Sequence, residues 1–169
     1  GFYGNITGKI ALADSQGNNF YNWNLSSPSG EVYASRSNAV TWSTINCTND
    51  SQVTQEQTYL SQSVSDPDSV NNTYTLTSHP TFLVGSRNIT TCKSTHAFNS
   101  TGVQGTGFWQ VLLSDAVNNT VYTTVLDSTV GSGFNNRPWH FQLLVGENGK
   151  AIGANATTLT PYYFYVELQ

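Results

Sequence analysis

The sequence ends in the run PYYFYVELQ (residues 161–169), in which aromatic and β-branched residues follow a single proline. This composition is typical of a β-strand, and Pro161 suits the position where a strand begins. A strand with one exposed face alternates apolar and polar residues. Here the even-numbered residues from Tyr162 to Leu168 form one apolar face, and the odd-numbered face also carries two tyrosines. We therefore expect this strand to lie in the middle of a sheet, with other strands or another copy of the chain on both sides.

The rest of the chain contains further short apolar segments, separated by turn signals about every 8–12 residues. We predict strands over residues 5–13, 20–25, 31–35, 39–45, 73–77, 80–85, 108–114, 121–126 and 139–145. Turns between them predict two hairpins, one of residues 5–13 with 20–25 and one of 108–114 with 121–126. This spacing indicates an all-β fold, an antiparallel β-sandwich of about nine or ten short strands with at most one short helix. The helix is expected over residues 53–60, with Asp50 or Ser51 as its cap and Val53, Gln57 and Leu60 on one face.

We expect one β-sandwich domain over residues 1–169, because the composition does not shift along the chain and no repeat of fixed period is present. The least regular part of the chain, an insertion of about residues 47–92, is bounded by the two cysteines, Cys47 and Cys92. In an oxidising compartment such a pair forms a disulfide. Closing a loop of this length stabilises a fold by about 4 kcal/mol in the chain-entropy description.

Charged residues make up 9% of the chain, against about 25% in an average soluble domain. The formal net charge is -4, and the six basic residues are scattered along the sequence. Nucleic-acid binding needs a clustered basic surface, and a helix lying on a membrane needs a basic amphipathic run. No apolar run approaches the roughly 20 residues of a membrane-spanning helix. We therefore expect no nucleic-acid partner and no membrane span in this chain.

The triplet Asn-x-Ser/Thr, which accepts N-linked glycans, is frequent. With 18 Asn and 41 Ser or Thr in 169 residues, about four such triplets are expected by chance, whereas the chain has nine. Their asparagines are Asn5, Asn24, Asn46, Asn49, Asn71, Asn88, Asn99, Asn118 and Asn155. The excess predicts a coat of glycans that hydrates a surface poor in charge, although turns rich in Asn and Thr would also produce such triplets.

The chain contains no methionine. This is expected if a secretory signal has been removed before Gly1, and also if the sequence is a piece of a longer protein. Together with the glycosylation triplets and the cysteine pair, it predicts a secreted glycoprotein, extracellular or at the cell surface.

Few residues suggest catalysis or metal binding. His79, His96 and His140 have no second ligand three or four residues away, and most acidic residues fall in predicted turns. Asp66-Pro67-Asp68 is the best calcium candidate, but two acids are too few to define a site. We therefore predict no enzyme, no cofactor and no metal.

The four tryptophans can be interpreted in two ways. Trp23, Trp42, Trp109 and Trp139, together with nine tyrosines, could form a platform on which sugars stack. Three of the four lie within predicted alternating strands, which favours the hydrophobic core instead.

Several segments resemble secreted, N-glycosylated surface proteins of small-genome archaea, which are essentially uncharacterised. These segments are GNITGKIALAD (residues 4–14), FYNWN (20–24), GEVYASR (30–36), YTTVL (122–126) and PYYFYVEL (161–168). The resemblance covers most of the chain, and it implies an archaeal cell-surface location but no catalytic residues.

The predicted function is structural: a subunit of a glycosylated surface filament or other cell-surface assembly that self-associates into a homopolymer. Soluble monomers usually protect edge strands with Lys, Pro or bulges, whereas the terminal strands predicted here carry one lysine, Lys9. A donor strand that completes the sheet of a neighbouring subunit would satisfy such edges, and we expect residues 1–13 to provide it. The alternative is a secreted carbohydrate-binding or adhesin module, and a secreted hydrolase is the third class.

Overall fold

The computed structural model describes residues 1–6, 9–13, 15–16, 19–24, 28–98, 104–127, 133–148 and 159–169. Its elements are, in chain order, β1 (Phe2–Gly4), β2 (Lys9–Ala13), β3 (Asn19–Asn24), β4 (Gly30–Ser35), η1 (Trp42–Thr44), β5 (Asn46–Cys47), α1 (Asp50–Tyr59), α2 (Val70–Thr73), β6 (Phe82–Val84), β7 (Arg87–Ile89), β8 (Ser94–Phe98), β9 (Gln104–Ser114), β10 (Thr120–Val125), η2 (Phe134–Asn136), β11 (Phe141–Leu143) and β12 (Tyr163–Leu168). All pairings between these strands are antiparallel, and α1 is the one described helix longer than four residues. The predicted all-β class is confirmed.

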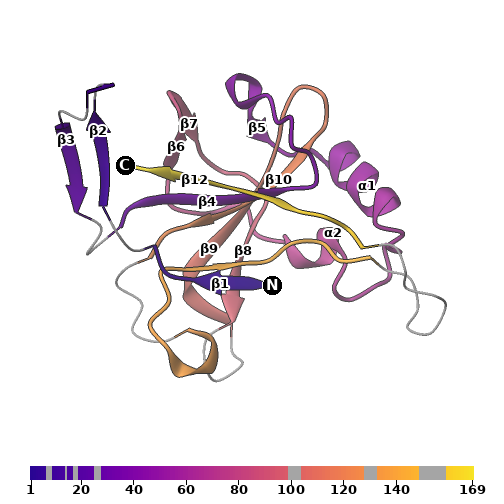
Figure 1. The fold of residues 1–169 in the computed structure, drawn as a ribbon. Coiled ribbons are helices and arrows are strands. Elements are labelled where there is room, and N and C mark those ends of the chain that lie inside the picture. Colours follow the sequence, from indigo (N-terminus) through magenta and orange to yellow (C-terminus); the bar gives the residue numbers. More distant parts are fainter. Residues whose placement is uncertain are drawn as a thin grey trace.

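A six-stranded sheet forms the centre of the molecule (Figure 1). Its strand order is β12-β4-β10-β9. Two strands share the outer edge of β9: β8 pairs with it as far as Val111, and β5 pairs with Leu113 and Ser114. The predicted hairpin of β9 with β10 is confirmed, and its apolar first strand lies in the sheet interior. The predicted pairing of β2 with β3 is also confirmed.

The terminal strand β12 lies at the edge of this sheet and not in its middle. It pairs with β4 from Tyr163 opposite Ser35 to Leu168 opposite Gly30, and no other described strand pairs with it. Gly30 has φ +128°, and a Cβ atom there would overlap the carbonyl oxygen of Glu167, so this end of the ladder needs glycine. The expectation of strand neighbours on both sides of β12 is therefore wrong within one chain.

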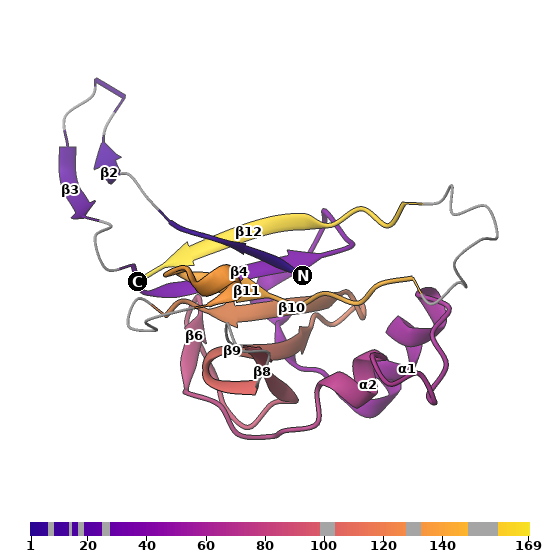
Figure 2. The same ribbon diagram turned by 90° about the horizontal axis from the view of Figure 1, so that it is seen from below.

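Layers cover both faces of the central sheet. On one face Val32 and Leu112 pack with Val53 and Leu60 of α1 and with Leu143 of β11. On the other face a second core packs Tyr33, Val111 and Val121 of the sheet against the β6–β7 hairpin and Cys92. The covering layers are two-stranded ribbons and short helices, and Figure 2 shows the β1–β11 ribbon lying across strands of the central sheet, so the sandwich is built around a single large sheet.

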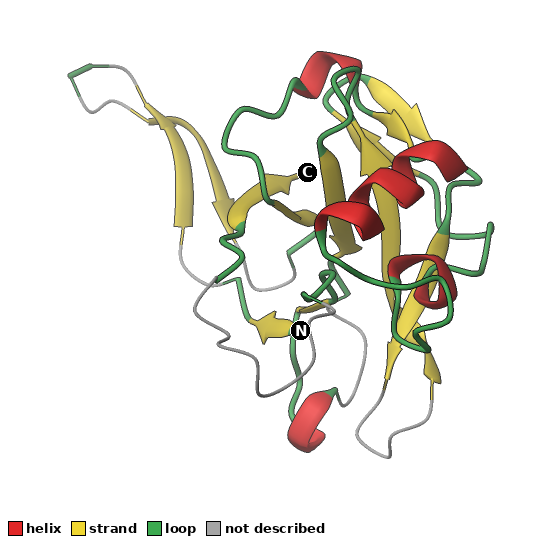
Figure 3. Cartoon of the chain, turned by 90° about the vertical axis from the view of Figure 1, so that its right-hand side faces the viewer, coloured by secondary structure: helices red, strands yellow, loops and turns green. Residues whose placement is uncertain are grey.

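Helix α1 begins at Asp50, three residues before the predicted start, and its N-cap lies one residue before the first predicted cap. Asn49 is the N-cap: its side chain accepts the Gln52 N–H at 3.0 Å, and the Gln52 side chain accepts the Asn49 N–H at 3.0 Å. This reciprocal capping box satisfies donors that a helix otherwise leaves unpaired. Val53, Gln57 and Leu60 are buried, as the sequence pattern predicted, and Glu56 is buried as well. Figure 3 shows α1 and α2 on the same side of the sheet.

Glu56 ties α1 to the sheet through a buried ion pair. Arg36, which follows β4, donates from its guanidinium to both carboxylate oxygens of Glu56, and the Tyr122 hydroxyl donates to the same group at 2.9 Å. The Arg36 guanidinium also lies 3.4 Å from the centre of the Tyr59 ring. These bonds satisfy a carboxylate whose burial would otherwise be costly.

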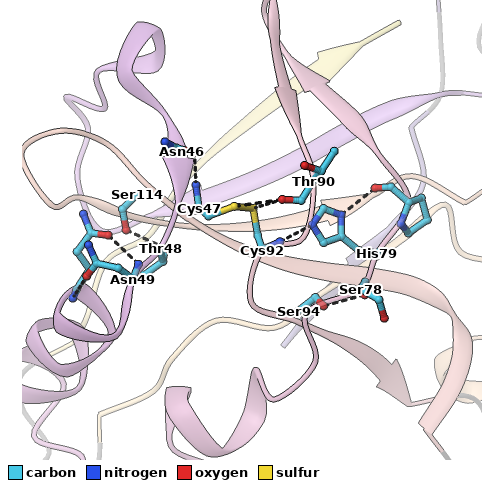
Figure 4. The surroundings of a disulfide bond; sticks show 12 residues. Asn46, Cys47, Thr48, Asn49, Ser78, His79, Thr90, Cys92, Ser94 and Ser114 are labelled. Atoms are coloured by element: carbon cyan, nitrogen blue, oxygen red, sulfur yellow. Dashed lines mark hydrogen bonds between the residues drawn. A yellow bond between two sulfur atoms is a disulfide. The ribbon is translucent and has the colours of Figure 1, made fainter.

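The predicted disulfide between Cys47 and Cys92 is confirmed, with Cα atoms 5.0 Å apart (Figure 4). It joins the end of β5 to the segment before β8, and so closes the loop that contains α1 and the β6–β7 hairpin. His79 lies beside it: Nε2 accepts the Cys92 N–H at 3.0 Å, and the other ring nitrogen is 2.8 Å from the Pro80 carbonyl. This histidine therefore serves the local backbone.

Three predicted strands are shorter or replaced. Over residues 39–45 the chain forms η1, because the Asp115 carboxylate accepts the Thr41 N–H and the Thr44 hydroxyl bonds back to the Thr41 carbonyl. Over residues 73–77 only a single bridge forms, between Leu76 and Ser94. The strand predicted over 139–145 is reduced to β11. Over residues 39–45 these side-chain hydrogen bonds prevail over the local strand propensity.

Candidate functional site

The outer edge of β12 is the first candidate site. In the described part of the chain this strand has a hydrogen-bonded neighbour on one side only, so the backbone groups directed away from β4 have no strand partner. Phe164 and Val166 are 44% and 51% exposed, and residues 163–168 contain no Lys, Arg or Pro. Such an edge can accept a strand from another chain.

Exposed aromatic residues of the N-terminal segment lie next to this edge. The Phe2 ring packs edge-to-face on the Phe164 ring with centroids 4.8 Å apart, and both side chains remain exposed. Tyr3 contacts the rings of Phe134 and Trp139. The apolar surface therefore continues from β12 across β1 to the residues before β11.

A groove beside the odd-numbered face of β12 is the second candidate site. It encloses about 630 Å³ between Trp42 of η1, the β6–β7 turn with Gly85 and Arg87, and Glu167 of β12. An adjoining hollow of about 290 Å³ shares Trp42 and Glu167 and adds Tyr33 and Tyr165. We call the two together the aromatic groove.

Trp42 is held in place by two tyrosine rings. Its ring centroid lies 5.1 Å from that of Tyr33 and 5.0 Å from that of Tyr165, both in edge-to-face geometry. The Tyr165 hydroxyl donates to the Ser37 carbonyl at 3.2 Å, which fixes this ring in turn. The indole remains partly exposed, so it is positioned by its neighbours and still offers surface to the groove.

Glu167, which lines the groove, is paired with a second glutamate that is buried behind it. Glu31 of β4 and Glu167 of β12 stand directly opposite each other in the strand register. The Tyr33 hydroxyl is 3.0 Å from Glu167 Oε2 and 3.5 Å from Glu31 Oε2. The Gly85 N–H donates to Glu167 Oε1 at 2.9 Å, and the Gln169 side chain donates to Glu31 at 3.1 Å. Two carboxyl groups therefore share one network of donors.

The two glutamates differ in exposure and therefore in charge. Glu31 is 2% exposed, whereas Glu167 lines the groove. Burial, and secondarily the nearby Glu167 carboxylate, raises the pKa of Glu31 to about 8. At neutral pH Glu31 is therefore mostly protonated, and the groove carries a single carboxylate, that of Glu167. Burial also raises the pKa of Tyr33, so its hydroxyl keeps its proton and donates it.

The sequence reasoning did not identify this glutamate pair. Residues 31 and 167 are 136 positions apart, and only the pairing of β4 with β12 brings them together. One signal was present: each glutamate falls inside a predicted strand, where an acidic residue is unusual. The sequence alone does not show that two such strands are neighbours.

The glycosylation triplets lie mostly on exposed surface. Six of their asparagines have described side chains, and all six are exposed: Asn5, Asn46, Asn49, Asn71, Asn88 and Asn118. Asn24 lies in β3, where side chains are not described, and Asn99 and Asn155 lie outside the described residues. No triplet begins within β4 or β12.

The tryptophans are not core residues where their side chains are described. Trp42, Trp109 and Trp139 are each partly exposed, and the prediction that they fill the sandwich core is wrong for these three. Trp109 lies against the ring of His96, with centroids 3.6 Å apart. The Trp23 side chain is outside the described part of the molecule.

The residues weighed for metal binding have local structural partners. Asp66 accepts the Ser63 N–H at 2.6 Å within a turn, and His140 Nδ1 accepts the Ile6 N–H at 3.0 Å. Across the described residues, no three His, Cys, Asp or Glu side chains come together in a group that could hold a metal ion. None of the helices described is both long enough and apolar enough to span a bilayer.

No protein-family model, no curated protein and no solved structure matches this chain. The outer edge of β12 and the aromatic groove are therefore the features from which a function can be proposed.

Proposed function

We propose that this protein is a structural subunit of a glycosylated extracellular filament or cell-surface assembly, without enzymatic activity, whose copies join by β-strand pairing at β12. The observation that supports the proposal is the outer edge of β12, which has no strand partner among the described strands and exposes Phe164 and Val166. An apolar edge strand of this kind promotes aggregation of a monomer, and in an assembly it can pair with a strand of the next subunit.

The distribution of glycosylation triplets supports the same role. Glycans on the exposed asparagines would hydrate loops, helices and the β7 strand, while β4 and β12 carry no triplet. A glycosylated copy would therefore keep the β12 edge accessible. The archaeal location implied by the sequence resemblance remains part of this proposal.

The proposed donor belongs to the N-terminal segment, residues 1–13, whose strands are β1 and β2. Within the single chain β1 pairs with β11, and β2 pairs with β3. The β2–β3 hairpin projects away from the central sheet in two views (Figures 1 and 2). We propose that this hairpin, already folded, adds the outer edge of β2, the strand within residues 1–13, to β12 of the next copy. A head-to-tail contact of this kind does not close on itself and produces a filament.

The assembly test compares two exposed apolar residues changed to lysine. Phe164→Lys places a charge on the β12 edge, and Val64→Lys places one on a surface residue that is 72% exposed and distant in sequence from both termini. We expect filaments in electron micrographs of the wild type and of Val64→Lys, and monomers of unchanged circular dichroism for Phe164→Lys. Filaments of Phe164→Lys equal to those of the wild type, or a wild type that stays monomeric, would refute the proposal.

A second candidate function is the secreted carbohydrate-binding or adhesin module. The observation that favours it is the partial exposure of Trp42 in the aromatic groove, next to the Glu167 carboxylate. A panel of immobilised glycans tests it directly, because a binding module must retain at least one of them and a purely structural subunit retains none.

A further inference from the structure

We propose that the aromatic groove binds a neutral oligosaccharide, with Trp42 stacking on a sugar ring and Glu167 and Arg87 bonding its hydroxyl groups. This inference deepens the second candidate function and does not depend on assembly through β12. It assigns the ligand class and the residues that would recognise it.

The indole of Trp42 has the properties of a stacking platform. Two tyrosine rings hold it at centroid distances of 5.0 and 5.1 Å, so little conformational entropy remains to be lost on binding. Its exposed surface faces a groove of about 630 Å³, within the range of small-ligand sites. The C–H face of a pyranose ring is the complement of such an apolar, rigid surface.

The polar residues of the groove are suited to hydroxyl groups. The Glu167 carboxylate is fixed by the Gly85 N–H and the Tyr33 hydroxyl, and its remaining lone pairs can accept from a ligand. Arg87 is exposed at the turn and takes part in neither of the ion pairs found among the described residues. Its guanidinium can donate to ligand oxygens.

The charge of the groove favours a neutral ligand. One carboxylate and one guanidinium line it, and Glu31 behind them is mostly protonated at neutral pH. An acidic sugar would meet the Glu167 carboxylate, and a basic one would meet Arg87. A neutral sugar can use both groups as hydrogen-bond partners without an unpaired charge.

Sugar hydrolysis does not follow from this arrangement. A glycosidase places two carboxyl groups on either side of the bond that it cleaves. Here Glu31 is 2% exposed and does not line the groove, so only one carboxyl group can reach a ligand.

The test uses mannotriose and triacetylchitotriose as neutral probes and trigalacturonic acid as an acidic probe. Binding is followed by tryptophan fluorescence and saturation-transfer NMR on unglycosylated protein carrying Phe164→Lys, so that assembly cannot affect the result. We expect saturable binding of a neutral probe, and binding weaker by about tenfold or more in Glu167→Gln and in Arg87→Ala, which corresponds to about 1.4 kcal/mol. The control variants Glu147→Gln and Arg137→Ala change exposed residues of the same types outside the groove and leave binding unchanged.

Three outcomes would overturn the inference: no neutral probe binds, only the acidic probe binds, or both groove variants bind as tightly as their controls. Cleavage of a probe would also contradict a binding role. If a neutral probe binds, competition by the glycosylated form of the protein identifies the glycans of a neighbouring copy as the ligand. Absence of competition assigns the groove to glycans of another source.

Discussion

The adjacent strands β4 and β12 differ in composition and in burial, and the more apolar strand, β12, is the less buried of the two. β12 has five apolar or aromatic residues among six, whereas β4 has three, with Gly30, Glu31 and Ser35 as the others. All six residues of β4 are buried, and none of β12 is. The reason is position: β4 has strands on both edges and layers over both faces, whereas β12 has one neighbour. Strand burial follows the place in the sheet, and an apolar strand at an edge is a surface available for contact.

The largest effect is expected from removing the disulfide, because it holds the β6–β7 hairpin as a layer over one face of β4. The disulfide closes the loop that holds the β6–β7 hairpin against Tyr33. The double substitution Cys47→Ala with Cys92→Ala should lower the free energy of unfolding by about 4 kcal/mol. Denaturant unfolding measures this loss, and hydrogen exchange should show faster exchange in β4 with little change in β12. Unaltered stability without the disulfide would contradict the role given to this layer.

Two valines that face each other across the ladder provide the sharpest test of the comparison. Val32 on β4 is 2% exposed, and its register partner Val166 on β12 is 51% exposed. Val32→Ala should lower the free energy of unfolding by about 2 kcal/mol, because it removes buried methyl groups and leaves a cavity. Val166→Ala, the matched control, should cost less than about 0.5 kcal/mol. Equal losses in thermal or denaturant unfolding would mean that β12 is buried in solution.

The glutamate pair between the two strands predicts how stability depends on pH. Because the pKa of Glu31 is raised to about 8 in the folded state, the folded protein holds a proton that the unfolded chain has already released. Stability should therefore be highest below about pH 4.5, fall as the pH rises to about 8, and then level off.

Denaturant unfolding at several pH values measures this loss, and Glu31→Gln should remove it because the amide does not titrate. Glu147→Gln, at an exposed glutamate, should leave the pH dependence unchanged. The same pH dependence in Glu31→Gln as in the wild type would assign the loss to other groups.

The smallest effect is expected at the contact between β12 and the N-terminal segment, which covers part of this strand. Phe2 and Phe164 form an edge-to-face pair while both remain exposed. A double-mutant cycle with Phe2→Ala and Phe164→Ala should give a coupling energy of about 0.5–1 kcal/mol. A coupling energy near zero would show that the N-terminal segment does not rest on β12 in solution, which would leave the edge still more accessible.

Local patterns predicted the elements whose causes are local. The capped helix near residue 50 follows from side chains within four positions of each other, and the β2–β3 and β9–β10 hairpins follow from turns between alternating strands. The disulfide was predictable because the chain has two cysteines and no other pairing. In η1, by contrast, the Asp115 carboxylate from another part of the chain replaces a predicted strand.

The candidate site was less predictable than the fold. The sequence suggested an aromatic sugar-binding surface and a donor strand, but it did not show which tryptophan is exposed or which strand edge has no partner. The Trp42 ring lies between Tyr33, from the strand just before η1, and Tyr165, from the last strand of the chain. Glu31 and Glu167 meet only through the register of β4 with β12.

By itself the sequence determined the all-β class, a capped helix near residue 50, the disulfide and the positions of the glycosylation triplets, since each depends on residue types and their pattern along the chain. Only the tertiary structure decided that the apolar strand β12 lies at an edge, that its partner strand β4 is fully buried, and that two glutamates share one tyrosine hydroxyl. These features depend on which strands become neighbours. Strand order results from the packing of all layers together, so no single stretch of the sequence contains it.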